Sequence, residues 1–446
     1  MIRTISSVAA MAVALLAPVV AMATEPPVET ASCHSGAYVL ADGRELVLQP
    51  SDLPNLRWRM LDGTAGKLFP AGEGAYAGGE GWSAREPVTT RATFGPCAAG
   101  RVRFERDGRA VEGRRIALRT TPVSFGSGDA TLYGELVMPL RGKPKAVVVL
   151  QYGSGDESAV ANNYVQHLLP LKDIAVFVFD KRGTGRSTGQ YTAHFGLMAG
   201  DMVAAVEAIR ALPELKGVPL GLMGESQGGW VAPLTAVRTK VDFVVVSYGL
   251  AVSIVEEDRS EVEQSLVSRG YGPDVLAQGE ALHDAATNVL DSGFTDGIDE
   301  LEHLKAASAG APWRNGLGGD YTGLLTSIPR EKMGDIKPAF SIGFEPHYDP
   351  VPTLEKLKVP MLWVLAGKDT GAPSKATITI LKRLQAQGSP IDLVVFPNAD
   401  HGIIAVDDAG KRLGRTAPGY FEVLGDWIAT RKLKAAYGDA AVSERR

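Results

Sequence analysis

The segment Val218–Pro233 joins a short apolar run to Gly224-Glu225-Ser226-Gln227-Gly228 and then to a helical pattern. This order predicts a strand, a sharp turn and a helix, because small residues two places before and after Ser226 allow the backbone to double back closely. The hydroxyl of a serine on such a turn is exposed at the carboxyl edge of a sheet. The segment therefore indicates a nucleophile elbow, with Ser226 as the nucleophile.

The same G-x-S-x-G spacing recurs at Gly185–Gly189, around Ser187. This second match follows the charged loop Asp180-Lys181-Arg182 and leads into Gln190–His194 rather than into an amphipathic helix. Because the strand, turn and helix together define the motif, we expect Ser226 and not Ser187 to be the nucleophile.

Length and composition are those of ordinary globular proteins. The 446 residues are 45% hydrophobic and 22% charged, which is enough for two or three domains with a large core. The formal net charge of −5 is mild, and no dense cluster of Lys and Arg stands out along the chain. We therefore expect no nucleic-acid partner.

The N-terminus has the layout of a secretory signal over residues 1–23. Arg3 precedes the apolar run Val8–Ala21, and Ala21-Met22-Ala23 supplies the small residues of a cleavage site. A retained membrane anchor is the alternative, but the run is short and no charged stop-transfer flank follows it. We expect an exported protein, periplasmic or extracellular, with no membrane span after signal cleavage.

The sequence has two cysteines, Cys33 and Cys97. In an exported protein two cysteines usually pair, so we predict a disulfide between them. Two cysteines without a matching histidine spacing do not form a metal site, and we expect no structural metal.

Residues 24–120 contain short alternating runs, such as Tyr38–Leu40 and Glu45–Leu48, joined by Asp-Gly turns. They predict a small all-β accessory domain. Its role is either to pack and shape the substrate site or to act as a separate binding module, and we favour the first. We place the hinge to the next domain near Thr120-Thr121-Pro122.

Two blocks, 121–250 and 350–446, have the pattern of an α/β core. Continuous β-rich runs such as Ala146–Leu150 and Ile174–Phe179 alternate with helical segments, as in a parallel sheet buried on both faces. Residues 251–349 show charged helical segments instead. We therefore predict an α/β fold with a mostly parallel sheet and a helical cap insertion, preceded by the small all-β domain.

Polar loops follow two strands of the second core block. The strand ending at Ala366 precedes Asp369, and the strand ending at Phe396 precedes His401. Loops that follow parallel strands lie at one edge of the sheet, where Ser226 also emerges. A serine hydroxyl needs an imidazole to take its proton, and the imidazole needs a carboxylate to orient it. We therefore expect Ser226, His401 and Asp369 to form a catalytic triad.

Other residues are weaker candidates for the same roles. Asp400 is the alternative acid, but adjacent side chains seldom face each other suitably, so we favour Asp369. His194 and His347 are alternative bases. His283 and His303 lie in the predicted helical insertion.

A tetrahedral intermediate also needs fixed N–H donors for its negative oxygen. We assign one to the backbone N–H of Gln227, the residue after the nucleophile. The second is expected from the Gly-rich loop Gln151–Gly155, where we assign the Ser154 N–H with Gly153 as its neighbour.

From about residue 130 to 435 the sequence resembles the α/β-hydrolase superfamily. The loop Asp180–Ser187 is similar to one that is mainly structural in many bacterial members of the superfamily. We therefore assign structural roles to Asp180 and Arg182. In the oxyanion loop, Tyr152 precedes Gly153 where many members have histidine. The matching motifs are Gly224–Gly228, Gly367-Lys368-Asp369, Asp400-His401-Gly402 and Asp180–Ser187.

The resemblance implies a serine hydrolase that acts through an acyl-enzyme on a small ester or peptide, requires no cofactor, and favours carboxylic esters. One alternative is a serine peptidase resembling the prolyl-oligopeptidase group, although the β-region is too short for a many-bladed propeller. A second is a non-catalytic binding protein. The cap is expected to overhang the site and set substrate choice, with Trp313 and Tyr321 either lining an acyl pocket or packing the cap.

Overall fold

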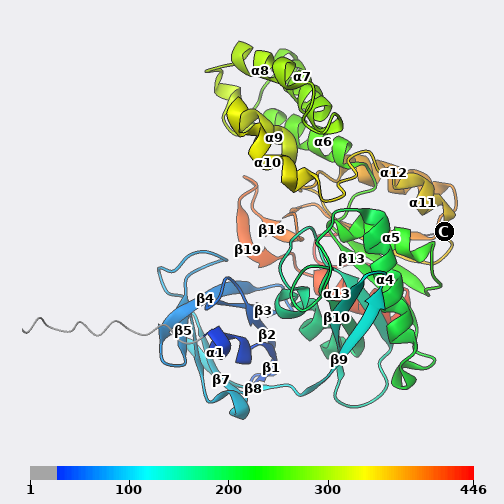
Figure 1. Ribbon diagram of the computed structural model, residues 1–446. Helices are drawn as coiled ribbons and strands as arrows, with labels where there is room; N and C mark the ends of the chain where they lie inside the picture. The colour runs from blue at the N-terminus through cyan, green and yellow to red at the C-terminus, as the bar shows by residue number, and fades with distance from the viewer. Residues whose placement is uncertain (1–27, 446) are drawn as a thin grey trace, which may run out of the picture.

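The computed structural model describes residues 28–445. Figure 1 shows three parts: a β-barrel at the lower left, a large sheet flanked by helices, and a group of helices at the top. The signal sequence predicted for residues 1–23 lies outside the described residues.

A closed, antiparallel barrel of eight strands forms the first part. Side chains of a strand alternate between its two faces. Along β3, Leu56, Trp58 and Met60 belong to the barrel core, so Arg57 and Arg59 lie on the outer face. The strands are β1 (Gly36–Leu40), β2 (Glu45–Pro50), β3 (Leu56–Met60), β4 (Ala65–Gly72), β5 (Ala75–Gly78), β6 (Thr90–Phe94), β7 (Arg101–Arg106) and β8 (Arg109–Arg115).

The predicted disulfide is present and joins the segment before the barrel to its second half. Cys33 ends the short helix α1 (Val28–Cys33), and Cys97 opens the 3-10 helix η1 (Cys97–Ala99). Their Cα atoms lie 5.8 Å apart across a sequence separation of 64.

A nine-stranded sheet follows, in the order β20-β16-β15-β14-β13-β11-β12-β10-β9. Strands β11 to β16 pair in parallel, whereas β10 is antiparallel to both β9 and β12. The parallel strands are buried on both faces: Val147 and Val149 enter one apolar cluster, and Val148 and Leu150 enter the other. The strands are β9 (Leu118–Ser127), β10 (Ala130–Pro139), β11 (Ala146–Gln151), β12 (Ile174–Phe179), β13 (Leu220–Glu225), β14 (Phe243–Ser247), β15 (Met361–Ala366), β16 (Ile391–Phe396) and β20 (Ala441–Ser443).

Helices cover both faces of this sheet. One apolar cluster contains residues of α4, α5, α11 and α12, and the opposite cluster contains residues of α2, α3 and α13. The sheet is thus the middle of three layers. The helices are α2 (Ala159–Asn162), α3 (Val165–Leu168), α4 (Phe195–Arg210), α5 (Gly228–Ala236), α11 (Val351–Lys356), α12 (Lys375–Ala386) and α13 (Tyr420–Thr430).

The first five α-helices after β14 form the group at the top of Figure 1. They enclose an apolar cluster of their own, which includes Trp313 and Tyr321 at 5% and 1% exposure. Both aromatic residues therefore pack the interior of this helical cap. The helices are α6 (Ile254–Val267), α7 (Pro273–Asp291), α8 (Ile298–Ala307), α9 (Asp320–Ser327) and α10 (Met333–Phe340).

The passage from barrel to sheet differs from the sequence analysis. The predicted hinge at Thr120–Pro122 lies inside β9, which pairs with β10 along its whole length. A proline is tolerated there because β9 is an edge strand. The small three-stranded sheet β17 (Ala399–Asp400), β18 (Ile404–Val406) and β19 (Arg412–Thr416) was not predicted either, and neither was β20.

The barrel is fixed against the α/β core by packing and hydrogen bonds. Ala37 and Val47 of the barrel belong to the same apolar cluster as α13. The Thr416 N–H donates to the Gly63 carbonyl at 2.8 Å, and a Cβ on Gly63 would lie 2.4 Å from the Thr416 oxygen. Because the backbones approach this closely, side chains of the barrel have defined positions relative to the core.

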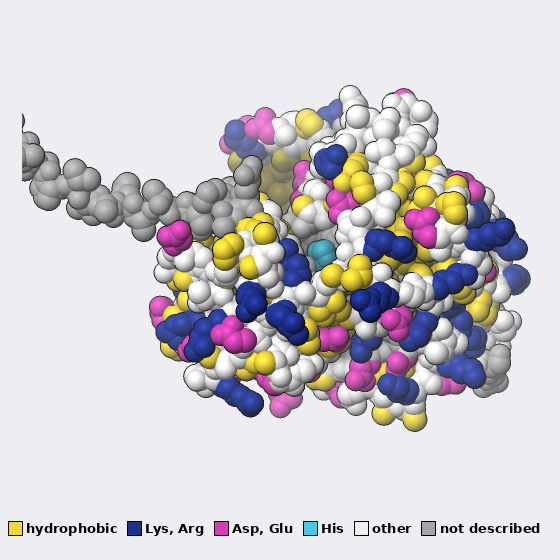
Figure 2. Space-filling model, turned by 90° about the horizontal axis from the view of Figure 1, so that it is seen from below, with side chains coloured by type: hydrophobic (Ala, Val, Ile, Leu, Met, Phe, Trp, Pro, Cys, Tyr) yellow, Lys and Arg dark blue, Asp and Glu magenta, His cyan; other side chains and the backbone are white. Residues whose placement is uncertain are grey.

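Across residues 28–445, none of the helices combines the length and apolar character that a bilayer requires. On the face drawn in Figure 2, basic and acidic side chains are interspersed among hydrophobic and uncharged ones. This face therefore presents no broad surface of a single charge.

Replacing both bridged cysteines, as Cys33→Ser with Cys97→Ser, should lower the free energy of unfolding by about 2–4 kcal/mol, because the bond restricts the unfolded chain. Denaturant unfolding against the oxidised protein measures the change. Thiol titration of denatured, unreduced protein should find no free thiol, and two free thiols would contradict the pairing.

Candidate active site

The turn between β13 and α5 holds its serine in an unusual backbone conformation. Ser226 has φ +50°, a region that residues other than Gly, Asn and Asp seldom adopt. The glycines on either side are required by contact: a Cβ on Gly224 would lie 2.0 Å from the Gly228 oxygen, and one on Gly228 would lie 2.5 Å from the Gln151 oxygen. The predicted strand, turn and helix are therefore present, with the backbone folded tightly around Ser226.

The structure brings Ser226, His401 and Asp369 together. His401 Nε2 lies 3.1 Å from Ser226 Oγ, and His401 Nδ1 lies 3.1 Å from Asp369 Oδ2. Asp369 is 2% exposed, and its Oδ1 accepts the N–H groups of Gly371 and Ala372 at 3.1 and 2.7 Å. A buried, held carboxylate, an imidazole and a serine hydroxyl thus form one continuous chain of hydrogen-bonding contacts.

Asp400, the alternative acid, is committed to other partners. Its Oδ1 accepts the Thr370 N–H at 2.7 Å and the His401 N–H at 2.8 Å, and its Oδ2 pairs with Arg412 Nε at 2.6 Å. Burial acts to raise the pKa of Asp400, but the hydrogen bonds from Thr370, Arg412 and His401 outweigh it and hold the pKa below its usual value. Asp400 therefore fastens the loop of Asp369 to that of His401.

The other serine and histidine candidates form contacts away from Ser226. Ser187 Oγ donates to the Asp180 carbonyl at 2.7 Å and accepts the Tyr133 N–H at 2.9 Å. His194 faces Glu345, and His347 faces Asp291. In the cap, His283 is buried against Asp258 and His303 is exposed.

Asp180 and Arg182 also make internal contacts. Asp180 accepts the Ser158 hydroxyl at 2.7 Å and the Arg186 N–H at 2.9 Å. Arg182 Nη2 pairs with Asp201 at 2.6 Å, and both side chains are about 5% exposed or less. Their loop is therefore held by its own hydrogen bonds and ion pairs.

The loop after β11 lies directly beside Ser226. A Cβ on Gly153 would lie 3.4 Å from the Ser226 Cβ, and Lys181 Nζ donates to the Gly153 carbonyl at 2.6 Å. Within the described chain, neither the Gln227 N–H nor the Ser154 N–H donates to a protein acceptor. Both amides remain available to a negatively charged oxygen.

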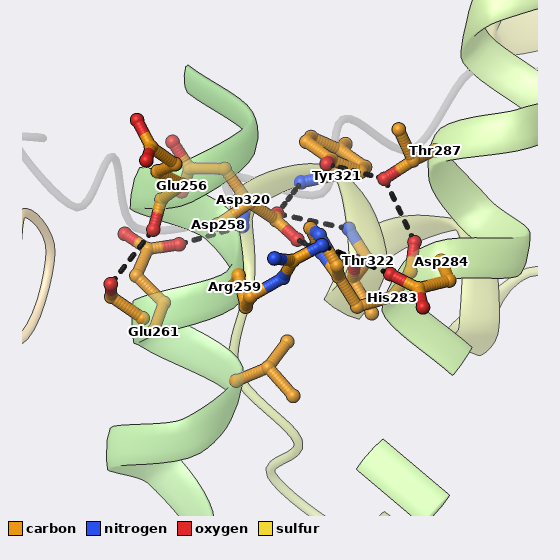
Figure 3. Close-up of polar contacts among 12 residues, drawn as sticks. Glu256, Asp258, Arg259, Glu261, His283, Asp284, Thr287, Asp320, Tyr321 and Thr322 are labelled. Carbon is orange, nitrogen blue, oxygen red and sulfur yellow. Dashed lines mark hydrogen bonds and ion pairs between the residues drawn. The ribbon is translucent and has the colours of Figure 1, made fainter. Parts of the chain in front are cut away.

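A buried carboxylate organises the cap, as Figure 3 shows. Asp258 of α6 accepts the N–H groups of Tyr321 and Thr322 at 2.9 and 3.1 Å, at the start of α9. Its other oxygen contacts the Thr322 hydroxyl at 2.5 Å and His283 Nδ1 at 3.0 Å. Asp258 thereby ties α9 to α6 and α7, and its negative charge lies at the positive end of α9.

More carboxylates surround this network. Glu261 is 5% exposed, and its Oε2 accepts the Asp320 N–H at 2.8 Å. Burial, followed by the charges of Asp320 and Asp258, raises the pKa of Glu261 to about 9. Burial also raises the pKa of Asp320, and the opposing charge that acts on it is that of His401. The acidic start of α9 therefore belongs to the electrostatic surroundings of His401.

Sequence reasoning missed one contributor to the site, the barrel residue Arg59. It lines a cavity of about 230 Å³ together with His401, Tyr152 and Glu225. Alternation along β3 puts Arg59 on the outer face of the barrel, but the sequence holds no signal that the α/β core covers that face.

Two family models match the chain on either side of most of the cap. A model described as serine aminopeptidase, S33 matches residues 142–254, and one described as prolyl oligopeptidase family matches residues 330–421. Together with the strand order and the elbow, these matches decide the classification. The chain belongs to the α/β-hydrolase superfamily.

Several named α/β-hydrolases are similar to this one. Human monoglyceride lipase is 32% identical over 97 residues, which cover 21% of this chain and 31% of the lipase. Esterase EstD of Thermotoga maritima is 26% identical over 298 residues, 64% of this chain and 61% of the esterase. The chain thus spans less than two thirds of either relative. A solved Pyrococcus furiosus esterase aligns with 64% of this chain and 84% of its own, at 16% identity and a TM-score of 0.42.

The raised pKa of Glu261 predicts how the stability of this α/β-hydrolase depends on pH. The folded protein keeps a proton that the unfolded chain releases near pH 4.3, so the stabilisation is complete below about that pH and is lost as the pH rises towards about 9. Glu261→Gln, which does not titrate, should therefore lie closest to the wild-type melting temperature at pH 4 and exceed it increasingly up to pH 8.5.

Melting curves at several pH values test this, with Glu263→Gln, at an exposed position of the same helix, as the matched control. A melting-temperature difference for Glu261→Gln that does not change with pH would contradict the assignment.

Proposed function

We propose that this α/β-hydrolase is an exported serine hydrolase that cleaves carboxylic esters through an acyl-enzyme on Ser226. The observation that carries the proposal is the contact of His401 with Ser226 Oγ on one side and with Asp369 on the other. The esterase and lipase among the similar proteins support an ester as the substrate. The signal-like segment 1–23 and the disulfide support export.

In the first step, Ser226 Oγ attacks the ester carbonyl carbon while His401 Nε2 takes the hydroxyl proton. Asp369 stabilises the imidazolium that forms, because its carboxylate faces Nδ1 from a buried position. The negative oxygen of the tetrahedral intermediate accepts the N–H groups of Gln227 and Ser154, with Gly153 next to them.

The intermediate then breaks its bond to the leaving alcohol, which receives the proton from His401. A water molecule attacks the acyl-enzyme in the second half, and His401 takes a proton from that water. Cleavage of the bond to Ser226 Oγ releases the carboxylic acid and returns the proton to the serine. No other reactant is needed for atoms and charge to balance.

A serine peptidase is the second candidate. The match of residues 330–421 to the prolyl oligopeptidase family favours it, and so does the β-domain that precedes the hydrolase core. A panel of matched esters and amides with the same acyl group separates the two activities. A non-catalytic binding protein would turn over neither, and its Ser226 would not react with a fluorophosphonate probe.

We further propose that residues 24–120 form an accessory domain, that 121–250 and 350–446 form the catalytic core, and that 251–349 form a cap that sets substrate choice. The charge relation between Asp320 and His401 supports a cap that lies over the site. Substituting cap residues should then change the ranking of acyl-chain lengths while Ser226 remains reactive.

Ser226→Ala should lower kcat on the order of 10³-fold or more and abolish labelling by a fluorophosphonate, because the attacking oxygen is lost. Ser187→Ala is the matched control, since Ser187 has the same motif spacing but contacts Asp180 and Tyr133. It should keep both labelling and most of the activity. Activity that survives in Ser226→Ala and disappears in Ser187→Ala would reverse the assignment.

Asp369→Asn should lower kcat by about 10³–10⁴-fold with little change in melting temperature, because the amide does not stabilise an imidazolium. Asp400→Asn should lower the melting temperature, because it weakens the contacts to Thr370 and Arg412, and should change kcat by less than about tenfold. Steady-state kinetics and thermal unfolding of both variants test the pair. The opposite pattern would make Asp400 the catalytic acid.

A further inference from the structure

The cavity next to His401 is built from both the barrel and the α/β core. Its volume is about 230 Å³. The barrel supplies Gln49, Arg59 and Trp82, and the core supplies the loop of Tyr152 together with Glu225. A substrate group in this cavity would lie between the barrel and the proposed base.

Arg59 is a buried cation without a partner ion. The residue is 9% exposed, and Nη1 is buried without a hydrogen-bond partner in the described chain. The carboxylate whose charge acts on it is that of Glu225, but no ion pair of 4.0 Å or less joins the two. Burial lowers the pKa of Arg59 and outweighs the opposing charge of Glu225, so the protein does not fully compensate the desolvation of this cation.

The other charged side chains that line the cavity, Arg412 and Glu225, have hydrogen-bond or ion-pair partners within the protein. Arg412 pairs with Asp400 at 2.6 Å. Glu225 Oε2 accepts the Asn163 amide at 2.7 Å, and burial raises the pKa of Glu225, which weakens its negative charge. Arg59 is therefore the uncompensated charge in the cavity.

Further unpaired polar atoms surround it. Trp82 Nε1 is a second buried donor without a partner, and Gln49 Oε1 and Glu225 Oε1 are buried acceptors without one. A carboxylate accepts two or more hydrogen bonds and carries the charge that an arginine lacks here. The cavity therefore has the donors that an anionic oxygen group needs.

The aromatic contacts of Arg59 leave these donors free. The guanidinium carbon lies 4.0 Å from the centre of the Tyr164 ring and 5.9 Å from that of Trp82. Such contacts orient a guanidinium, but they form no hydrogen bond with any of its five N–H donors. A carboxylate, in contrast, accepts hydrogen bonds from these donors. The ring of Tyr164 thus holds Arg59 in place and leaves its N–H groups to a ligand.

We propose that this cavity is a subsite for a carboxylate on the substrate, and that Arg59 of the barrel is the residue that binds it. The inference rests on the proposed ester hydrolysis at Ser226 and assigns its substrates to the class of esters that carry a free carboxylate near the scissile bond. The cavity volume suits a short carboxylated chain or ring and excludes a long acyl tail. The barrel is then part of the substrate site.

Two matched substrate pairs test the proposal, one for each side of the ester bond. The acyl pair is the 4-methylumbelliferyl half-ester of glutaric acid and the methyl ester of that compound. The alcohol pair is 4-(butyryloxy)benzoate and its methyl ester. For at least one pair, kcat/KM should be about 10–100-fold higher for the carboxylate, which is the range expected of hydrogen bonds to a charged group.

Arg59→Gln should reduce that ratio by about tenfold or more, because kcat/KM should fall much further on the carboxylates than on their methyl esters. Arg59→Lys should keep part of the preference, because it keeps the charge. Arg57→Gln is the matched control: Arg57 lies on the same face of β3 and contacts the Trp82 ring, but it is not among the residues that line the cavity. Its ratio should equal that of the wild type.

The preference also has a test that needs no variant. Glutarate should inhibit hydrolysis of the neutral methyl esters competitively, whereas glutaramide at the same concentration should not. The proposal is overturned if the wild type prefers neither carboxylate, if the preference persists in Arg59→Gln, or if glutarate and glutaramide inhibit equally.

Failure of this proposal and failure of the proposed function give different results. Fluorophosphonate labelling of Ser226 with hydrolysis of the neutral esters, but without any carboxylate preference, removes the subsite and leaves the hydrolase. Absence of both labelling and ester hydrolysis removes the proposed function itself.

Discussion

The positive φ of Ser226 is the constraint on which the site depends. A non-glycine residue in this region is destabilised by about 1–3 kcal/mol, so the surrounding structure has to impose it. Here the Ser226 N–H donates to the Ser247 carbonyl at 3.0 Å, and a Cβ on Gly229 would lie 2.8 Å from the Gly249 Cα. The adjoining strand and helix therefore leave the turn no room to relax, and the hydroxyl keeps its direction.

Two parts of the protein outside the α/β core, the cap and the barrel, contribute charged side chains near this turn. The cap brings carboxylates, since Asp258, Glu261 and Asp320 meet at the start of α9, where helix dipole and hydrogen bonds hold them. The barrel brings the cation Arg59. His401 thus has both the acidic residues of the cap and the cation of the barrel in its electrostatic surroundings, and Glu261 keeps its proton near neutral pH because burial and the neighbouring carboxylates raise its pKa.

Much of the α/β core could be predicted from the sequence, because strands buried on both faces read as continuous apolar runs and polar residues follow them directly. Ser226, Asp369 and His401 lie in such positions, and the structure brings their side chains together. Other features depend on pairing between distant segments, which local patterns do not encode. The closure of β1 with β8 and the edge position of β9 are of this kind.

The contact between barrel and core contains the charged residue Arg59, whose contacts with the rings of Tyr164 and Trp82 leave a buried N–H donor without a hydrogen bond. Ala37 and Val47 bury apolar surface there, and the Thr416 N–H donates to a barrel carbonyl. These contacts hold the barrel against the core without a charged side chain. An uncompensated guanidinium is a destabilising choice in such a place, where an apolar side chain of similar size is often neutral or better. The position of Arg59 beside His401 therefore argues that its charge serves a ligand rather than the interface.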